Sequence, residues 1–194
     1  MERDKKLYII SGCNGAGKTT VSYTVFPDVL KCEEFVNADE IAKGLSPFHP
    51  ESVAIEAGML MLKRIDDLLE QGVNFAIETT LAARSYVRLV EKAHERGYEV
   101  RLIFLWLSSP EMAVERVAQR VREGGHNIPE DVVQRRYHAG LSNLFNIFME
   151  RVDYWLLMDN SKTPRNIVAE GGIDMETKIY DTELFDYLKG YVED

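Results

Sequence analysis

Residues 7–20 read LYIISGCNGAGKTT, and the remaining sequence is best interpreted outward from this stretch. An apolar run leads directly into a G-x-x-x-x-G-K-[ST] loop, the phosphate-loop pattern that joins a strand to a helix. Its glycines allow successive backbone N–H groups to point into one concavity, where the phosphates of a nucleotide bind. The stretch therefore predicts a nucleotide site and not a chance glycine-rich turn.

Two residues of this loop carry specific expectations. Lys18 is expected to reach the β- and γ-phosphates of ATP, and Thr19 to offer its hydroxyl to Mg²⁺. Cys13 occupies a variable position of the loop, so we interpret it as a small filler and not as a nucleophile. The helix that follows would add its positive N-terminal end to the anion site. The expected ATP-binding residues are Gly12, Asn14, Gly15, Ala16, Gly17, Lys18, Thr19 and Thr20.

Composition and charge restrict the class of protein. With 194 residues, 45% of them hydrophobic and 28% charged, the chain is expected to form one soluble domain. The net charge of −9 argues against a general nucleic-acid binder, because no overall positive field would hold a phosphate backbone. No apolar run is long enough for a secretory signal or a membrane span, and two cysteines imply no disulfide framework. We therefore expect a cytoplasmic protein with a small-molecule substrate and no nucleic-acid or membrane partner.

Strand and helix patterns alternate along the chain. Strands are expected at 7–10, 34–39, 73–80, 100–107 and 154–158. Helices are expected at 20–26 (ending at Pro27), 51–71, 85–96, 110–122 and 130 to about 152. A hairpin within 166–180 and a helix from residue 181 or 182 follow. The predicted fold is α/β and P-loop kinase-like: one domain over 1–194, with a parallel five-stranded sheet, helices on both faces, a helical lid at about 110–136 and a C-terminal appendage at about 162–194.

Ligands of such sheets bind outside the carboxyl ends of the strands, which singles out the polar residues there. Asp39 follows the second strand and is expected to act as a base on, or to orient, an acceptor hydroxyl; the alternative is a helix N-cap. Glu78 ends an apolar run as a Walker B acid does, and would hold the metal through water or bind substrate hydroxyls; the alternative is a solvated carboxylate. Thr79 and Thr80 would contact the acceptor through their hydroxyl groups, and Arg84 would bind an anionic group of the acceptor.

Arginines gather around the glycine pair at 124–125. They are Arg116, Arg120, Arg122, Arg135 and Arg136. Two helices that carry arginines and meet at a glycine loop indicate a lid that neutralises the transferred phosphoryl group; the alternative is a solvated basic face. Asn160 and Ser161, which follow the fifth strand, would frame the adenine, although D-N-S is also a plain turn signal.

Several motifs together resemble the zeta-toxin family of P-loop kinases. They are GCNGAGKTT, FVNADEIAKGLSP, AIETTLAARSY and RVAQRVREGGHNIPED, within about 7–161. The resemblance implies ATP-dependent phosphorylation of a small hydroxyl-bearing molecule such as UDP-N-acetylglucosamine. It implies that Lys18 and Thr19 hold ATP and Mg²⁺, that Asp39 is the base, and that Arg120 and Arg135 are the lid arginines, with Arg122 a rival for Arg120. It also implies an antitoxin protein as partner, although the sequence holds no recognisable antitoxin segment.

Two hypotheses of different class follow. The first is a small-molecule kinase whose acceptor is a nucleotide-linked sugar, with NAD, a nucleoside or a polynucleotide end as other acceptors. The second is a nucleotide-hydrolysing switch or binding module. An acceptor pocket with a base distinguishes them, and Asp39 together with Glu78 favours the kinase.

Overall fold

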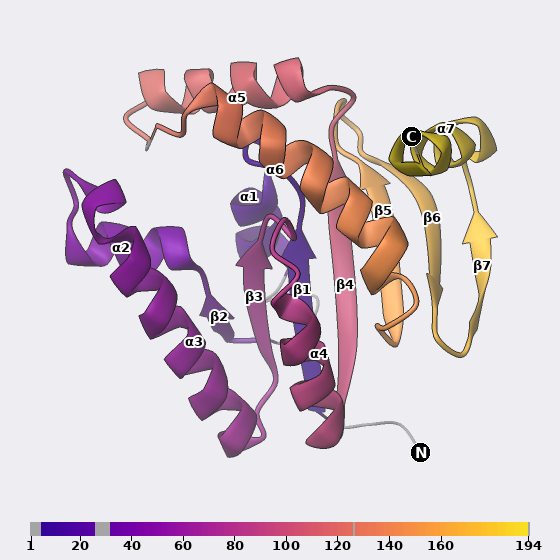
Figure 1. The fold of residues 1–194 in the computed structure, drawn as a ribbon, viewed down its shortest axis with the longest axis horizontal. Coiled ribbons are helices and arrows are strands. Elements are labelled where there is room, and N and C mark those ends of the chain that lie inside the picture. The colour runs from indigo at the N-terminus through magenta and orange to yellow at the C-terminus, as the bar shows by residue number, and fades with distance from the viewer. Residues whose placement is uncertain (1–4, 26–31, 126, 194) are drawn as a thin grey trace.

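One sheet organises the molecule (Figure 1). The computed structural model describes residues 5–25, 32–125 and 127–193. Within them the strands lie in the order β2 (Glu34–Val36), β3 (Phe75–Thr79), β1 (Lys5–Ser11), β4 (Tyr98–Trp106), β5 (Tyr154–Asp159), β6 (Asn166–Gly172) and β7 (Met175–Ile179). The strands from β2 to β5 are parallel, whereas β6 and β7 are antiparallel to their neighbours.

The predicted α/β class is confirmed, and the strand count is corrected. The hairpin expected as a separate feature pairs with β5 and extends the five parallel strands to a seven-stranded mixed sheet. An edge strand exposes unpaired N–H and C=O groups, and β6 pairs with those of β5 through a short connection that only an antiparallel strand allows.

Helices connect the strands on both faces of the sheet. They are α1 (Lys18–Val25), α2 (Ala38–Leu45), α3 (Ala54–Gln71), α4 (Tyr86–Glu95), α5 (Pro110–Arg122), α6 (Glu130–Asn143) and α7 (Thr182–Glu193), with the short helices η1 (Pro50–Val53) and η2 (Leu144–Phe148). In Figure 1, α4 and α6 lie in front of the sheet and α1 lies behind it. The chain moves along the sheet in one direction from β1 to β2 and in the other from β3 to β4 and from β4 to β5, and right-handed connections in the two directions place their helices on opposite faces. None of the described helices is both long and apolar enough to span a membrane.

Two expected elements are corrected by the structure, and one expected boundary is not tested. The expected second strand stops at Val36, because Asn37 caps a helix, α2, that the patterns did not predict. The expected helix over 130 to about 152 ends its α-helical part at Asn143 and continues as the π-helical η2. The expected end of the first helix at Pro27 lies outside the described residues.

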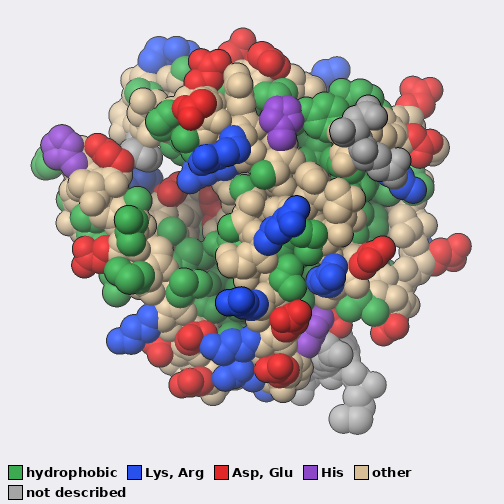
Figure 2. Space-filling view, viewed as in Figure 1, with side chains coloured by type: hydrophobic (Ala, Val, Ile, Leu, Met, Phe, Trp, Pro, Cys, Tyr) green, Lys and Arg blue, Asp and Glu red, His purple; other side chains and the backbone are tan. Residues whose placement is uncertain are grey.

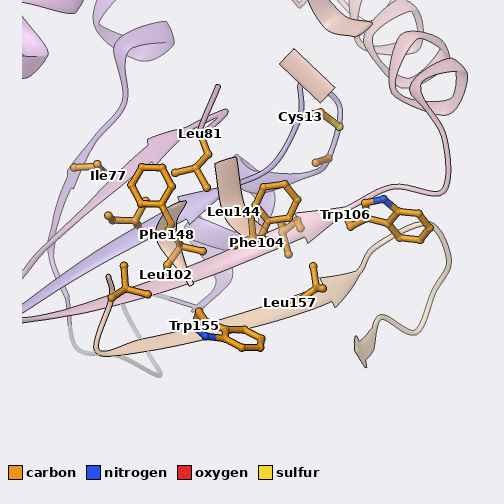
Figure 3. Close-up of a cluster of buried hydrophobic side chains, with 14 of the residues drawn as sticks. Cys13, Ile77, Leu81, Leu102, Phe104, Trp106, Leu144, Phe148, Trp155 and Leu157 are labelled. Atoms are coloured by element: carbon orange, nitrogen blue, oxygen red, sulfur yellow. The ribbon is translucent and has the colours of Figure 1, made fainter. Parts of the chain in front are cut away.

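The main core fills the space between the front of the sheet and its helices. Alternate residues of the strands point to this face, and they pack against α3, α4, α6, η2 and α7. Figure 3 shows part of this cluster, in which Leu144 and Phe148 lie near Leu102 and Phe104 of β4. The opposite face carries a smaller cluster around Tyr8, whose buried members include Cys32. The larger core therefore holds α6, which carries part of the site described below.

Phe148→Ala is expected to lower the free energy of unfolding by about 3–5 kcal/mol, because it opens a cavity where a fully buried ring stood. Phe48→Ala is the matched control, since the Phe48 side chain is 90% exposed and its removal leaves no cavity. Urea denaturation of both variants measures the difference. Equal stability losses would contradict this location of the core.

Candidate functional site

The phosphate loop packs closely against two other parts of the chain, at Leu105 and Asn160. Gly12 has φ +136°, and a Cβ there would lie 2.3 Å from the Leu105 carbonyl oxygen. Gly17 has φ +82°, and its Cβ would lie 2.9 Å from Nδ2 of Asn160. Only glycine fits both the left-handed backbone and the close approach at these positions. Burial raises the pKa of the Cys13 thiol to about 11, so the thiol is protonated at neutral pH. This agrees with a small side chain that fills space and does not act as a nucleophile.

Lys18 and Thr19 join the loop to the end of β3. Lys18 is buried; its Nζ donates to the Cys13 carbonyl at 2.9 Å and lies 3.9 Å from Oε1 of Glu78. The Thr19 hydroxyl lies 2.9 Å from Oε2 and 3.1 Å from Oε1 of Glu78, to which it donates. The residues expected to meet the phosphates and the metal are therefore adjacent in space.

Asn37 links Glu78 to α2 and was not among the predicted site residues. Its Nδ2 donates to Oε2 of Glu78 at 2.9 Å, and its Oδ1 accepts from the Asp39 amide at 2.8 Å. The second contact caps α2, so Asp39 lies in the first turn of the helix and is not its N-cap. An asparagine before the acidic pair Asp39 and Glu40 is a recognisable cap signal, but nothing in the sequence indicates its contact with Glu78.

The carboxyl group of Glu78 has a raised pKa. Burial is the main cause, and the positive charge of Lys18 and the hydrogen bond from Thr19 act in the opposite direction. The described residues hold no group of three or more His, Cys, Asp or Glu side chains that would cage a metal ion. Mg²⁺ in nucleotide sites takes few protein ligands and is otherwise held by phosphates and water. Thr19 beside the carboxylate of Glu78 fits an ion bound in that way.

Two cavities meet at Asp39. One has a volume of about 210 Å³, and its lining includes Thr19, Asp39 and Arg120. The other has a volume of about 160 Å³. Its lining includes Asn14, Lys18, Asn37, Asp39, Glu78, Thr79, Thr80, Tyr86 and Arg136. The structure therefore brings together the loop, Asp39 and the residues after β3, as the order of strand ends predicted.

The arginines of α5 and α6 separate into two groups. Arg120 lines the cavity that holds Asp39 and Thr19, whereas Arg136 lines the cavity that holds Lys18, and its Nη1 donates to Oδ1 of Asn14 at 3.2 Å.

Arg122 is exposed and bonds to the Gln119 side chain, and Arg135 is also exposed. Successive helical residues point about 100° apart. Arg136, and not its neighbour Arg135, therefore faces the phosphate loop. Arg116 donates to the Ser161 carbonyl at 3.0 Å and lines a separate cavity.

The turn after β3 is supported by α6. Thr79 Oγ1 accepts from the Leu81 amide at 3.1 Å, and Leu81 has φ +59°, an unusual value for a branched residue. The buried Asn143 donates to the Leu81 carbonyl at 2.9 Å, and a Cβ on Gly140 would lie 2.4 Å from the Thr80 carbonyl oxygen. Close packing against α6 thus holds Thr79 and Thr80 at the cavity.

Two further residues lie near this turn. Arg84 is exposed and lines neither cavity that meets at Asp39. Tyr86, two residues farther along, lines the cavity beside Lys18. An aromatic side chain at the start of a helix is usually interpreted as core, so the sequence did not single it out.

Asn160 lies beside the loop on the side opposite to Asp39. Its Nδ2 donates to the Ala16 carbonyl at 2.7 Å, and its Oδ1 accepts from Nε of Arg165 at 2.8 Å. It lines a cavity with Gly17, Thr20, Arg116 and Met158. This cavity adjoins the phosphate loop, and binding of the adenine beside Asn160 stays a prediction.

A family model and a curated relative match this chain in sequence. The model of the Zeta toxin family matches residues 1–163, which include every site residue named above except those after residue 163. A Haemophilus influenzae protein described as uncharacterized is 30% identical over 140 residues, which make up 69% of this chain and 98% of that protein.

Solved structures share the fold at low identity. The AvrRxo1-ORF1:-ORF2 complex with ATP has a TM-score of 0.78 and 20% identity, over 95% of this chain. This chain spans 63% of the length of that one. The PezAT toxin–antitoxin structure of Streptococcus pneumoniae has a TM-score of 0.65 and 14% identity, over 99% of this chain and 87% of that one. At such identities these likenesses show the fold alone.

Asn37→Ala is expected to be about 1 kcal/mol less stable than Asn37→Ser, because serine can still accept from the Asp39 amide and alanine cannot. Both variants lose the amide that donates to Glu78, so their difference in urea denaturation isolates the cap. If the two variants were equally stable, Asn37 would not cap α2.

Proposed function

Since this chain belongs to the zeta toxin family, we propose that it is an ATP-dependent kinase that transfers the γ-phosphoryl group of ATP to a hydroxyl of a nucleotide-linked sugar. The observation that carries the proposal is the position of Asp39, which lines both the cavity with Lys18 and the cavity with Thr19 and Arg120. A nucleotide-hydrolysing switch does not need a carboxylate such as Asp39 beside a cavity lined with polar side chains.

Binding of ATP is assigned to the phosphate loop. The N–H groups of the loop and Lys18 hold the phosphates, and Arg120 and Arg136 neutralise charge on the transferred group. Arg136 takes the role that the family resemblance gave to Arg135, because it lines the cavity and Arg135 is exposed. Thr19 and Glu78 would hold Mg²⁺, which would supply further charge neutralisation.

Transfer is assigned to Asp39. Its carboxylate orients the acceptor hydroxyl and takes its proton while the hydroxyl oxygen bonds to the γ-phosphorus and the bond to the β,γ-bridging oxygen breaks, which releases ADP. Its place in the first turn of a capped helix limits its movement. Glu78, Thr79 and Thr80 hold sugar hydroxyls.

The acceptor and the partner are proposed from chemistry and family together. Carboxylate and hydroxyl groups around the cavity suit a sugar, and exposed Arg84 would meet the phosphates of its nucleotide. UDP-N-acetylglucosamine is the leading candidate on family likeness. Since PezAT is a toxin–antitoxin system, we also propose an antitoxin protein as partner of this chain.

With ATP, Mg²⁺ and UDP-N-acetylglucosamine, ³¹P NMR is expected to show a new phosphomonoester resonance. Asp39→Asn should reduce its rate of appearance by roughly 10²–10⁴, because the amide cannot accept the proton. Lys18→Ala should reduce it by several orders of magnitude. Asp186→Asn, which removes one exposed carboxylate on α7, is the control and should leave the rate unchanged. ATP hydrolysis without transfer to any small acceptor would refute the kinase and support the switch.

Arg136→Ala is expected to lower the rate of transfer by roughly 10²–10³, whereas Arg135→Ala should change it less than about twofold. Both variants remove one cation from the same helix, so net charge is matched and only the direction of the side chain differs. Single-turnover kinetics at saturating ATP measure the effect, with melting temperatures to verify folding. The opposite ranking would return the role to Arg135.

A further inference from the structure

Helix α3 carries a second apolar stripe that the core does not use. Ile55, Met59 and Leu62 are spaced four and three residues apart, and their side chains are 83%, 60% and 60% exposed. The core stripe of the same helix runs through other residues, among them Met61 and Ile65. The outward flank of an amphipathic helix is ordinarily polar, so this stripe indicates a binding surface.

The stripe forms one wall of a groove of about 610 Å³. The other wall comes from the start of α4 and the segment before it, where Ala83, Tyr86 and Leu89 line the groove. Figure 2 shows hydrophobic side chains gathered at the left of this face, over the position of α3 in Figure 1. The groove is therefore an apolar surface open to solvent beside the sheet.

The groove continues into the cavity at Asp39. Ala38, Met61 and Tyr86 line both the groove and the cavity that holds Lys18 and Glu78. Ala38 directly precedes Asp39 in the first turn of α2. A molecule whose hydroxyl lies at Asp39 therefore has a path past these three residues into the groove.

The ionic side chains that line the groove do not favour a strongly charged ligand, because two of the three neutralise each other. Asp66 and Lys92 form an ion pair with each other across the groove, from α3 and α4. Arg88 is the third ionic residue of the lining, and it is exposed. Methionine, leucine and tyrosine side chains instead favour a flexible apolar group, because they adapt to its shape.

We infer that the acceptor carries an apolar group, of the size of a short acyl chain, on an atom next to the reacting hydroxyl, and that this group lies in the α3–α4 groove. The inference rests on the proposed kinase function and names the class of its substrate. The N-acetyl group of UDP-N-acetylglucosamine is bonded to a ring carbon next to a free hydroxyl. This group is short, so it would reach only Ala38, Met61 and Tyr86, where the cavity joins the groove. A longer acyl group at that position would fill the groove.

The test compares UDP-N-acetylglucosamine with its N-hexanoyl analogue. The wild-type kcat/KM is expected to be at least about tenfold higher for the hexanoyl compound, since its added methylene groups become buried. The double variant Met59→Gln, Leu62→Gln should lose this preference and keep the kcat/KM of the acetyl compound. Ile173→Gln, a change at a half-exposed apolar residue between β6 and β7, should keep the preference. Equal kcat/KM values for both compounds with the wild-type protein would overturn the inference.

A second measurement separates the groove from the proposed kinase function. If neither compound is phosphorylated, the proposed acceptor class fails, and fluorescence of 1-anilinonaphthalene-8-sulfonate decides about the groove. If the double variant no longer binds the dye and Ile173→Gln still does, the groove is an apolar ligand site. Equal dye binding by all three proteins would overturn the inference. A wild-type dimer that the double variant dissociates, as seen by sedimentation, would also overturn it, because the groove would then join two copies of the chain.

Discussion

The buried carboxylate of Glu78 connects the parts of the chain on which the site depends. It accepts hydrogen bonds from Thr19 and Asn37 and lies 3.9 Å from the ammonium group of Lys18. Lys18 and Thr19 follow β1, Asn37 follows β2, and Glu78 is the penultimate residue of β3, so one side chain joins the carboxyl ends of three parallel strands. A buried carboxylate is costly unless it is hydrogen-bonded and near a cation, and this requirement holds the phosphate loop against the start of α2.

Helix α6 extends this arrangement to the acceptor side. Its inward face contributes Gly140 and Asn143, which hold the turn after β3, and one turn earlier it presents Arg136 to the phosphate loop. Tyr137 between them is buried and donates to the Leu107 carbonyl after β4. The same packed helix therefore positions both the turn after β3 and the cation beside the phosphate loop.

The zeta toxin family membership and the geometry support a phosphoryl-transfer enzyme, and we propose the α3–α4 groove as its specificity surface. Helix α3 serves two purposes along its length, since Met61 belongs to the core and also lines the cavity, while Met59 and Leu62 lie outside the core. Exposed apolar side chains reduce solubility, so their presence beside a polar reaction pocket is best explained by a ligand that covers them.

The sequence by itself determined the phosphate loop, the α/β class and the order of strand ends, because each depends on contacts between residues close in the chain or on a simple alternation of apolar residues. Lys18, Asp39 and Glu78 could therefore be placed at one edge of the sheet without a structure. Only the tertiary structure decided that Arg136 and not Arg135 faces the loop, that Asn37 bonds to Glu78, and that the hairpin joins the sheet. These features depend on how a helix is rotated about its axis and on pairings between distant segments, and such long-range packing leaves no local pattern in the sequence.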